Sequence, residues 1–200
     1  MRTFVLRARK GPTIAADIQP SIGGENHFEV VASTLVNAIF MSKAIREDVT
    51  FHTVLEASPE GPKVVTVRSW ELYRIGGFHE AAAVGLFRKA LEGSARMVKD
   101  ETRNIAQGLD VSKMSFERLV RGIAESEPTY LLDRKGDDIR VTDFQEGGGC
   151  FLLTDHIPMA SATLSLLRRI GVRKISLGPR VLFASQCVTL IHNELDRTIF

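Results

Sequence analysis

The pair of residues most suggestive of chemistry is Asp155-His156, a carboxylate and an imidazole that directly follow the apolar run at residues 151–153. Such groups are costly to place beside an apolar interior without partners, and surroundings of this kind are where the pKa values of catalytic groups are shifted. A second interpretation is structural, because Asp is a favoured N-cap residue and a helix is predicted shortly afterwards. Both interpretations stay open.

Cys187 and His192 form a second pair, which could act as a nucleophile and its base. On one predicted helix they lie about 140° apart around the axis, so their side chains diverge. Cys187 is better explained as a small apolar residue. His192 and Asp196 share a helix face, where we expect a surface hydrogen bond rather than half of a metal site. Because Cys150 is the only other cysteine, we expect reduced thiols and no metal.

The glycine-rich turns of nucleotide-binding folds are missing. Residues 147–149 are three consecutive glycines, but they precede an apolar strand. Dinucleotide and triphosphate sites need the glycines after a strand and at the start of a helix. These two classes of cofactor are therefore disfavoured.

Short apolar strands alternate with amphipathic helices along the chain. Strands are predicted at residues 3–9, 46–55 after an initial charged turn, 64–67, 129–132, 151–153 and 174–177, and helices at 27–42, 80–91, 115–125, 164–170 and 182–195. Residues 92–114 are polar and mixed, and no element is predicted there. The alternation is typical of an α/β protein with a mostly parallel sheet. The length fits a single domain over residues 1–200.

Three loops follow strands in the second half of the chain, at residues 133–136, 154–158 and 178–180. In a parallel sheet they all leave the carboxyl ends of the strands, where α/β proteins place their ligand crevice. We therefore consider one shared binding site. The alternative, that the loops only connect elements, is equally compatible with their spacing.

Composition places the chain among ordinary globular proteins, with 44% hydrophobic residues, 25% charged residues and a net charge of +2. No apolar run approaches the roughly 20 residues of a membrane span, so we expect no membrane partner and a cytoplasmic location. Positive charge gathers at the start, where Arg2, Arg7, Arg9 and Lys10 precede Asp17, the first acid. This basic start is either part of a nucleic-acid surface or the charged protection of a strand edge.

Several segments together carry a family pattern. They are Phe151-Leu-Leu-Thr-Asp-His-Ile157, Ile175-Ser-Leu-Gly-Pro179 and Ala184-Ser-Gln-Cys-Val-Thr-Leu-Ile-His-Asn-Glu-Leu-Asp196, with weaker likeness at Met1-Arg-x-Phe4 and Ile45-Arg-x-Asp-Val49. The pattern resembles that of the archaeal tRNA pseudouridine N1-methyltransferase family, part of the SPOUT superfamily of S-adenosylmethionine-dependent RNA methyltransferases. The resemblance covers most of the chain and is weakest over residues 68–125.

The resemblance implies a SPOUT fold. This is an α/β fold whose mostly parallel sheet is flanked by helices, with the C-terminal helix threaded through a loop as a deep trefoil knot and two subunits packed as a homodimer. Base rates oppose any knot, so this expectation depends on the resemblance alone. It also implies that S-adenosylmethionine lies among the three loops, in contact with Leu132, Thr154, Leu177, Gly178, Leu182 and Cys187.

The implied reaction is methylation of N1 of pseudouridine in tRNA, at position 54 of the T-loop. Asp155 is then the candidate for orienting or deprotonating the base. We expect the RNA phosphates to be held by Arg2, Arg7, Arg9, Lys10 and Arg46, while a flipped or loop-exposed base enters the site.

Two departures from the family pattern keep alternatives open. Thr154 stands where the pattern has Gly, and Pro158 where a second Gly is common. A side chain at these positions can prevent close approach of the backbone to a ligand. The alternatives are a SPOUT methyltransferase that acts on another RNA base or position, and a module that binds RNA or the cofactor without catalysis.

Overall fold

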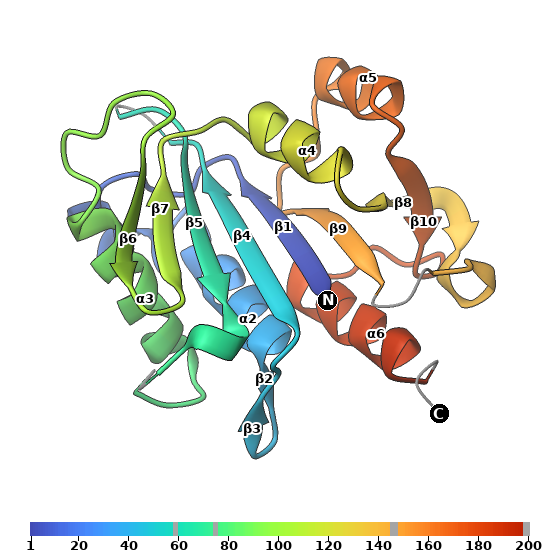
Figure 1. The fold of residues 1–200 in the computed structure, drawn as a ribbon, viewed down its shortest axis with the longest axis horizontal. Coiled ribbons are helices and arrows are strands. Elements are labelled where there is room, and N and C mark those ends of the chain that lie inside the picture. Colours follow the sequence, from blue (N-terminus) through green and yellow to red (C-terminus); the bar gives the residue numbers. More distant parts are fainter. Residues whose placement is uncertain (58–59, 74–75, 145–147, 198–200) are drawn as a thin grey trace.

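Figure 1 shows the fold as a computed structural model, which describes residues 1–57, 60–73, 76–144 and 148–197. One eight-stranded sheet has the order β10-β8-β9-β1-β4-β5-β7-β6. Its strands are β1 (Arg2–Ala8), β4 (Val49–Leu55), β5 (Lys63–Arg68), β6 (Thr102–Ala106), β7 (Leu109–Ser112), β8 (Thr129–Asp138), β9 (Gly149–Thr154) and β10 (Arg173–Ser176). A separate ribbon consists of β2 (Phe40–Met41) and β3 (Ala44–Ile45).

The helices are α1 (Ile18–Ser21), α2 (Phe28–Ile39), α3 (Glu80–Glu92), α4 (Phe116–Ala124), α5 (Ser161–Arg169) and α6 (Ala184–Arg197). All five helices predicted from the apolar spacing are present, as α2 to α6. None of the helices described in the structure has the length and apolar character that a membrane span needs.

The prediction of an α/β fold with a mostly parallel sheet is confirmed. Strands β10, β8, β9, β1 and β4 run parallel to one another, while β5, β7 and β6 extend the sheet in antiparallel fashion. The prediction of no element at residues 92–114 was wrong, because β6 and β7 form a hairpin there. The residues of β6 are exposed or half-buried, so no apolar pattern marks it, and Gly108, with φ of 73°, makes the turn.

Each face of the sheet has its own core, and β1 contributes to both. Phe4 and Leu6 pack with α2, α3 and α6 on one face, whereas Val5 packs with α4 and α5 on the other. Successive residues of the strand therefore point to opposite faces of the sheet. Every residue of β1 is buried, as expected for a central parallel strand covered on both sides.

Strand β8 is longer than predicted, and the expected turn at residues 133–136 lies inside it. Its pairing with β10 shifts register between Lys174 and Ile175. At this shift Gly136 approaches the neighbouring backbone so closely that a Cβ atom there would lie 2.5 Å from the Ile175 nitrogen. A glycine is therefore required where the two strands meet.

An ionic network around the buried side chain of Arg2 joins the C-terminal half of α6 to the start of β1. Arg2 is only 3% exposed. It donates to Asp196 at 2.6 Å and pairs with Asp48 at 3.2 Å, and Arg46 donates to the other oxygen of Asp196 at 2.7 Å. The hydrogen bonds to Arg46, opposed by burial and helped by Arg2, lower the pKa of Asp196 to about 2.

His192 completes this network. Its Nδ1 atom accepts from Nη1 of Arg2 at 2.8 Å, and its Nε2 atom donates to the carbonyl oxygen of Ala38 in α2 at 2.9 Å. Burial, with the nearby charges of Arg46 and Arg2, lowers its pKa to about 3, so the ring is neutral. The predicted surface hydrogen bond between His192 and Asp196 is replaced by a shared partner, Arg2.

Candidate functional site

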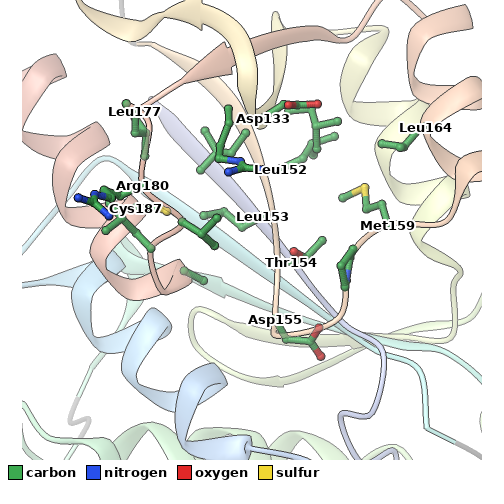
Figure 2. A pocket seen from close by; sticks show the side chains of 18 residues that line it. Asp133, Leu152, Leu153, Thr154, Asp155, Met159, Leu164, Leu177, Arg180 and Cys187 are labelled. Carbon is green, nitrogen blue, oxygen red and sulfur yellow. The ribbon is translucent and has the colours of Figure 1, made fainter.

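A cavity of about 340 Å³ lies where β8, β9 and the segment before α6 come together (Figure 2). Its size is in the range of small-molecule sites. It is lined by Leu131, Leu132, Asp133, Arg134, Leu152, Leu153, Thr154, Asp155, Pro158, Met159, Leu164, Leu177, Gly178, Arg180, Val181, Leu182, Ala184 and Cys187. The three segments that we considered as one shared site therefore do converge on a single cavity.

All six residues predicted to contact a cofactor line this cavity, namely Leu132, Thr154, Leu177, Gly178, Leu182 and Cys187, and so does Asp155. Its walls are mostly apolar, with leucine the commonest residue, and its polar side chains are few. In Figure 2, Asp133 lies on one side, Arg180 on another, and Thr154 and Asp155 along the loop that follows β9. An apolar pocket with few polar groups is typical of a site that binds an organic ligand in one orientation.

The backbone conformation at Thr154 does not require the glycine of the family pattern. Thr154 is the last residue of β9 and pairs in register with Arg7. It is not among the described residues with positive φ, so glycine is not needed there for conformational reasons. Gly178, in contrast, has φ of 120°, and its amide donates to Oγ of Ser176 at 3.1 Å.

Asp155 fixes the loop after β9 to the end of β1. Its Oδ2 atom accepts from the backbone amide of Arg9 at 3.0 Å, its Oδ1 atom accepts from the amide of Ile157 at 2.8 Å, and its own amide donates to the Arg7 carbonyl at 3.1 Å. The alternative role as a helix cap is wrong, because the N-cap of α5 is Ala160.

His156 is exposed and lies outside the cavity lining. Its ring meets the ring of His27 edge to face, with centroids 4.9 Å apart. His27 precedes α2 in a left-handed conformation with φ of 49°, and its Nδ1 atom lies 3.0 Å from Oε1 of Glu29. The imidazole of the Asp155-His156 pair thus faces α2 rather than the cavity.

Cys187 and His192 do not form a catalytic pair. Cys187 lines the cavity, and burial raises its thiol pKa to about 11, so the thiol is protonated at neutral pH. His192 faces Arg2 and Ala38 instead. The divergence predicted from the helix geometry is confirmed. Among the described residues, no group of three or more His, Cys, Asp or Glu side chains is placed to hold a metal ion.

The five residues predicted to hold RNA phosphates do not form one surface. Arg2 and Arg46 belong to the network with Asp196. Arg7 is also buried; it donates to Glu56 at 3.0 Å and lies with its guanidinium 4.6 Å from the Phe116 ring centroid. These three arginines have partners inside the protein. This corrects the expectation that all five residues hold RNA phosphates.

Arg9 and Lys10 are the two members of the predicted set that are exposed. They follow β1 at the edge to which Asp155 is fixed, through the amide of Arg9. Of the five predicted residues, only Arg9 and Lys10 are therefore still expected to contact RNA phosphates.

The cavity also contains polar side chains that were not named as contacts from the sequence, although they lie in the segments 133–136 and 178–180. Arg134 and Arg180 are exposed and line it. Asp133 lines it too, and it accepts from Nζ of Lys174 at 2.5 Å and from the amide of Lys135 at 2.9 Å. For Arg180 a signal was present in the sequence, since residues 156–193 include basic residues but no Asp or Glu.

Comparison with known proteins gives a family match over residues 1–200, to the family described as "Putative SAM-dependent RNA methyltransferase". A Vibrio cholerae protein named "Putative pseudouridine methyltransferase" is 48% identical over 197 residues, covering 98% of this chain and 97% of that protein. Proteins of the same name from Vibrio campbellii, 47% identical over 197 residues, and Shewanella baltica, 46% identical over 196 residues, each align over 98% of both chains.

Among solved structures, Archaeoglobus fulgidus Nep1 bound to S-adenosylhomocysteine is similar with a TM-score of 0.59. The alignment covers 99% of this chain and 97% of that chain, at 14% identity. At this identity the likeness is one of fold.

Proposed function

We propose that this chain, which belongs to the S-adenosylmethionine-dependent RNA methyltransferase family matched along its whole length, methylates N1 of pseudouridine in RNA. The observation that carries the proposal is that Asp155 and the six predicted cofactor residues line one cavity. The relatives named pseudouridine methyltransferases support this target, and we place it in the T-loop of tRNA at position 54.

The cavity suits S-adenosylmethionine in size and chemistry. Leucines on three sides give an apolar bed for the adenosine, while Gly178 leaves its backbone open on the side of the cavity, since a Cβ there would meet nothing within 4 Å. The carboxylate of Asp133 and the guanidinium of Arg180 lie at the lining, where they complement the ammonium and carboxylate groups of a methionine moiety. When bound, the cofactor supplies an activated methyl group on a sulfonium.

Asp155 is our candidate for orienting or deprotonating the target base. Its two hydrogen bonds from Arg9 and Ile157 hold the carboxylate in place. Each carboxylate oxygen has lone-pair capacity for a further donor, so Asp155 can accept a hydrogen bond from the N–H group of an entering base. Removing that proton while the methyl group arrives is the task that the chemistry requires.

We further propose the remaining SPOUT features, the deep trefoil knot at the C-terminus and the homodimer. The close approach of β8 and β10 at Gly136 and the anchoring of α6 beside β1 are the local features that support a threaded C-terminal segment. The exposed apolar side chains of Val181, Phe183 and Leu190 support a partner subunit at α6.

The two alternatives remain methylation of another RNA base or position, and binding without catalysis. The test has two steps. S-adenosylmethionine should raise the melting temperature of the purified protein, and mass analysis of tRNA nucleosides should show N1-methylpseudouridine only when the protein is present. No thermal shift would favour a module without cofactor chemistry, and loss of a different methylated nucleoside in cells lacking the protein would favour another target.

A further inference from the structure

One stretch of a chain that is nearly neutral has a net positive charge, because it contains cations and no acids. The chain has 26 Lys and Arg residues against 24 Asp and Glu residues. Residues 156–193 contain none of these acids, yet they include Arg168, Arg169, Arg173, Lys174 and Arg180. All five side chains are exposed, and they lie in α5, in β10 and in the segment before α6.

Several cations line the candidate cofactor cavity or the cavity next to it. Arg134 and Arg180 line that cavity, while Arg168 and Lys174 line a second one of about 250 Å³. The two cavities adjoin, because Leu131 and Leu164 line both. Figure 2 shows Arg180 and Leu164 on opposite sides of the first cavity. Arg168 follows Leu164 by one helical turn and so shares its face of α5.

Most of these side chains are not neutralised by the protein. Within the described parts of the chain, no hydrogen bond or ion pair involves the side chains of Arg134, Arg168, Arg169 or Arg180. Lys174 is the exception, because it pairs with Asp133. The guanidinium of Arg173 lies 5.2 Å from the Tyr130 ring centroid. Gathered like charges that lack acidic partners favour a polyanion at this surface.

We propose that Arg134, Arg168, Arg169, Arg173, Lys174 and Arg180, here called the α5–β10 basic surface, bind RNA phosphates on both sides of the nucleotide that enters the cavity. The inference rests on the proposed function for the identity of that nucleotide. Five of the six residues are arginines, whose planar guanidinium groups match phosphate geometry in bidentate fashion. An acidic protein segment would also be attracted, but it would have no reason to flank a cavity of nucleoside size.

The proposal predicts which pair of cations matters for RNA binding. Three double variants each remove two charges: Arg168→Gln with Arg169→Gln on α5, Arg88→Gln with Lys89→Gln on α3, and Arg9→Gln with Lys10→Gln after β1. All six side chains are exposed. Arg168 and Arg169 do not line the cofactor cavity, so stabilisation by S-adenosylmethionine should persist in the α5 variant and show that it is folded.

The measurement is the affinity for total tRNA at several salt concentrations. The α5 variant should bind about tenfold more weakly and lower the slope of log affinity against log salt by about 1 to 2. The α3 variant should match the wild type, and Arg168→Lys with Arg169→Lys should recover most of the slope. An unchanged slope in the α5 variant, or an equal loss in the α3 variant, would overturn the proposal.

Other outcomes separate this inference from the proposed function. If the Arg9 and Lys10 variant alone carried the loss, the basic surface would be wrong while methylation of RNA could stand. If the α5 variant lost affinity as expected but wild-type protein added no methyl group to tRNA, the surface would stand and the proposed function would fail. Tighter binding of an acidic peptide than of tRNA by the wild type would also overturn the assignment to RNA.

Discussion

Protonation of His192 should loosen the attachment of α6, and the structure sets the size of the effect. The side chain is 3% exposed and its Nδ1 atom accepts from Arg2, so a proton there would break that hydrogen bond. The charged ring would also face Arg2 and Arg46, offset only by the hydrogen bond to the Ala38 carbonyl and by Asp196. Burial is the first cause that lowers its pKa to about 3, whereas a histidine in the unfolded chain has a pKa of about 6.5.

Because the folded pKa lies below the unfolded one, the unfolded chain binds more protons as the pH falls. The stability linked to His192 is therefore complete above about pH 6.5 and is lost progressively towards about pH 3. At pH 5, which is about 1.5 units below the unfolded value, the loss amounts to about 2 kcal/mol at roughly 1.4 kcal/mol per unit. Such a loss is a large fraction of the stability of a typical domain.

The assay is urea unfolding at pH 7 and at pH 5 for the wild type and for His192→Gln. The glutamine amide can still accept from Arg2 and donate to Ala38, but it does not titrate. Between the two pH values the wild type should lose about 2 kcal/mol more than the variant. His52, whose pKa burial lowers to about 4, titrates in both proteins and cancels in the difference.

Asn193→Gln, at an exposed position of the same helix, is the matched control and should follow the wild type. An equal loss of stability in the wild type and in His192→Gln would refute the reasoning, because it would mean that the ring is not held neutral by its surroundings.

Three further predictions concern the cavity and its supports. Asp155→Asn should slow methyl transfer by about 100-fold or more while S-adenosylmethionine still raises the melting temperature; full-rate transfer would exclude the proposed role. Gly136→Ala should destabilise the protein by about 1 to 3 kcal/mol in urea unfolding, since its Cβ would lie 2.5 Å from the Ile175 nitrogen. Gly122→Ala on α4, with nothing within 4 Å of the added Cβ, should be neutral or stabilising by up to about 1 kcal/mol. Cys187→Ala should keep its methyl-transfer rate within about tenfold of wild type, because a thiol with a pKa of about 11 is not a nucleophile at neutral pH; complete loss of transfer, with the cofactor still bound, would contradict this.

The helices and strands that could be predicted from the sequence are those whose buried residues follow a regular pattern of apolar residues. In α2, Phe28, Val31 and Leu35 are all buried, so the helical spacing of apolar residues was visible. In β1 and β9 nearly every residue is buried, and each strand contains a short apolar run, at residues 4–6 and 150–153. The edge strand β6 has neither signal, because half-buried residues alternate irregularly with exposed ones along it and because hydrogen bonds to β7 decide its conformation.

The end of β8 was missed for a different reason. Residues 133–136 are polar and end in glycine, which is typical of a turn. In the folded chain Lys174 pairs with Asp133, and Gly136 allows β10 to approach closely. Both facts depend on a strand that lies far along the sequence. Local composition therefore predicted a turn where tertiary contacts stabilise a strand.

The residues that line the cavity could be predicted from the sequence, because the position of the backbone determines them. The partners of the charged side chains could not. The cavity lining follows from which strands are neighbours, and the family pattern carries that information. The fate of a surface arginine does not follow from its position near the site, because it depends on acids elsewhere in the chain. Arg2 and Arg46 both form ion pairs with Asp196. They therefore hold α6 in place and are not part of an RNA surface.

The network of Arg2, Arg46, His192 and Asp196 holds the same helix, α6, that borders the cavity. Its first turns border the cavity through Ala184 and Cys187, while its later turns are fixed by His192 and Asp196 to the start of β1. A ligand that packs against the first turns stabilises the same helix that the network holds, so the two should be coupled through a shared folded state. Acid should then weaken binding of S-adenosylmethionine in the wild type more than in His192→Gln, although neither His192 nor Asp196 lines the cavity.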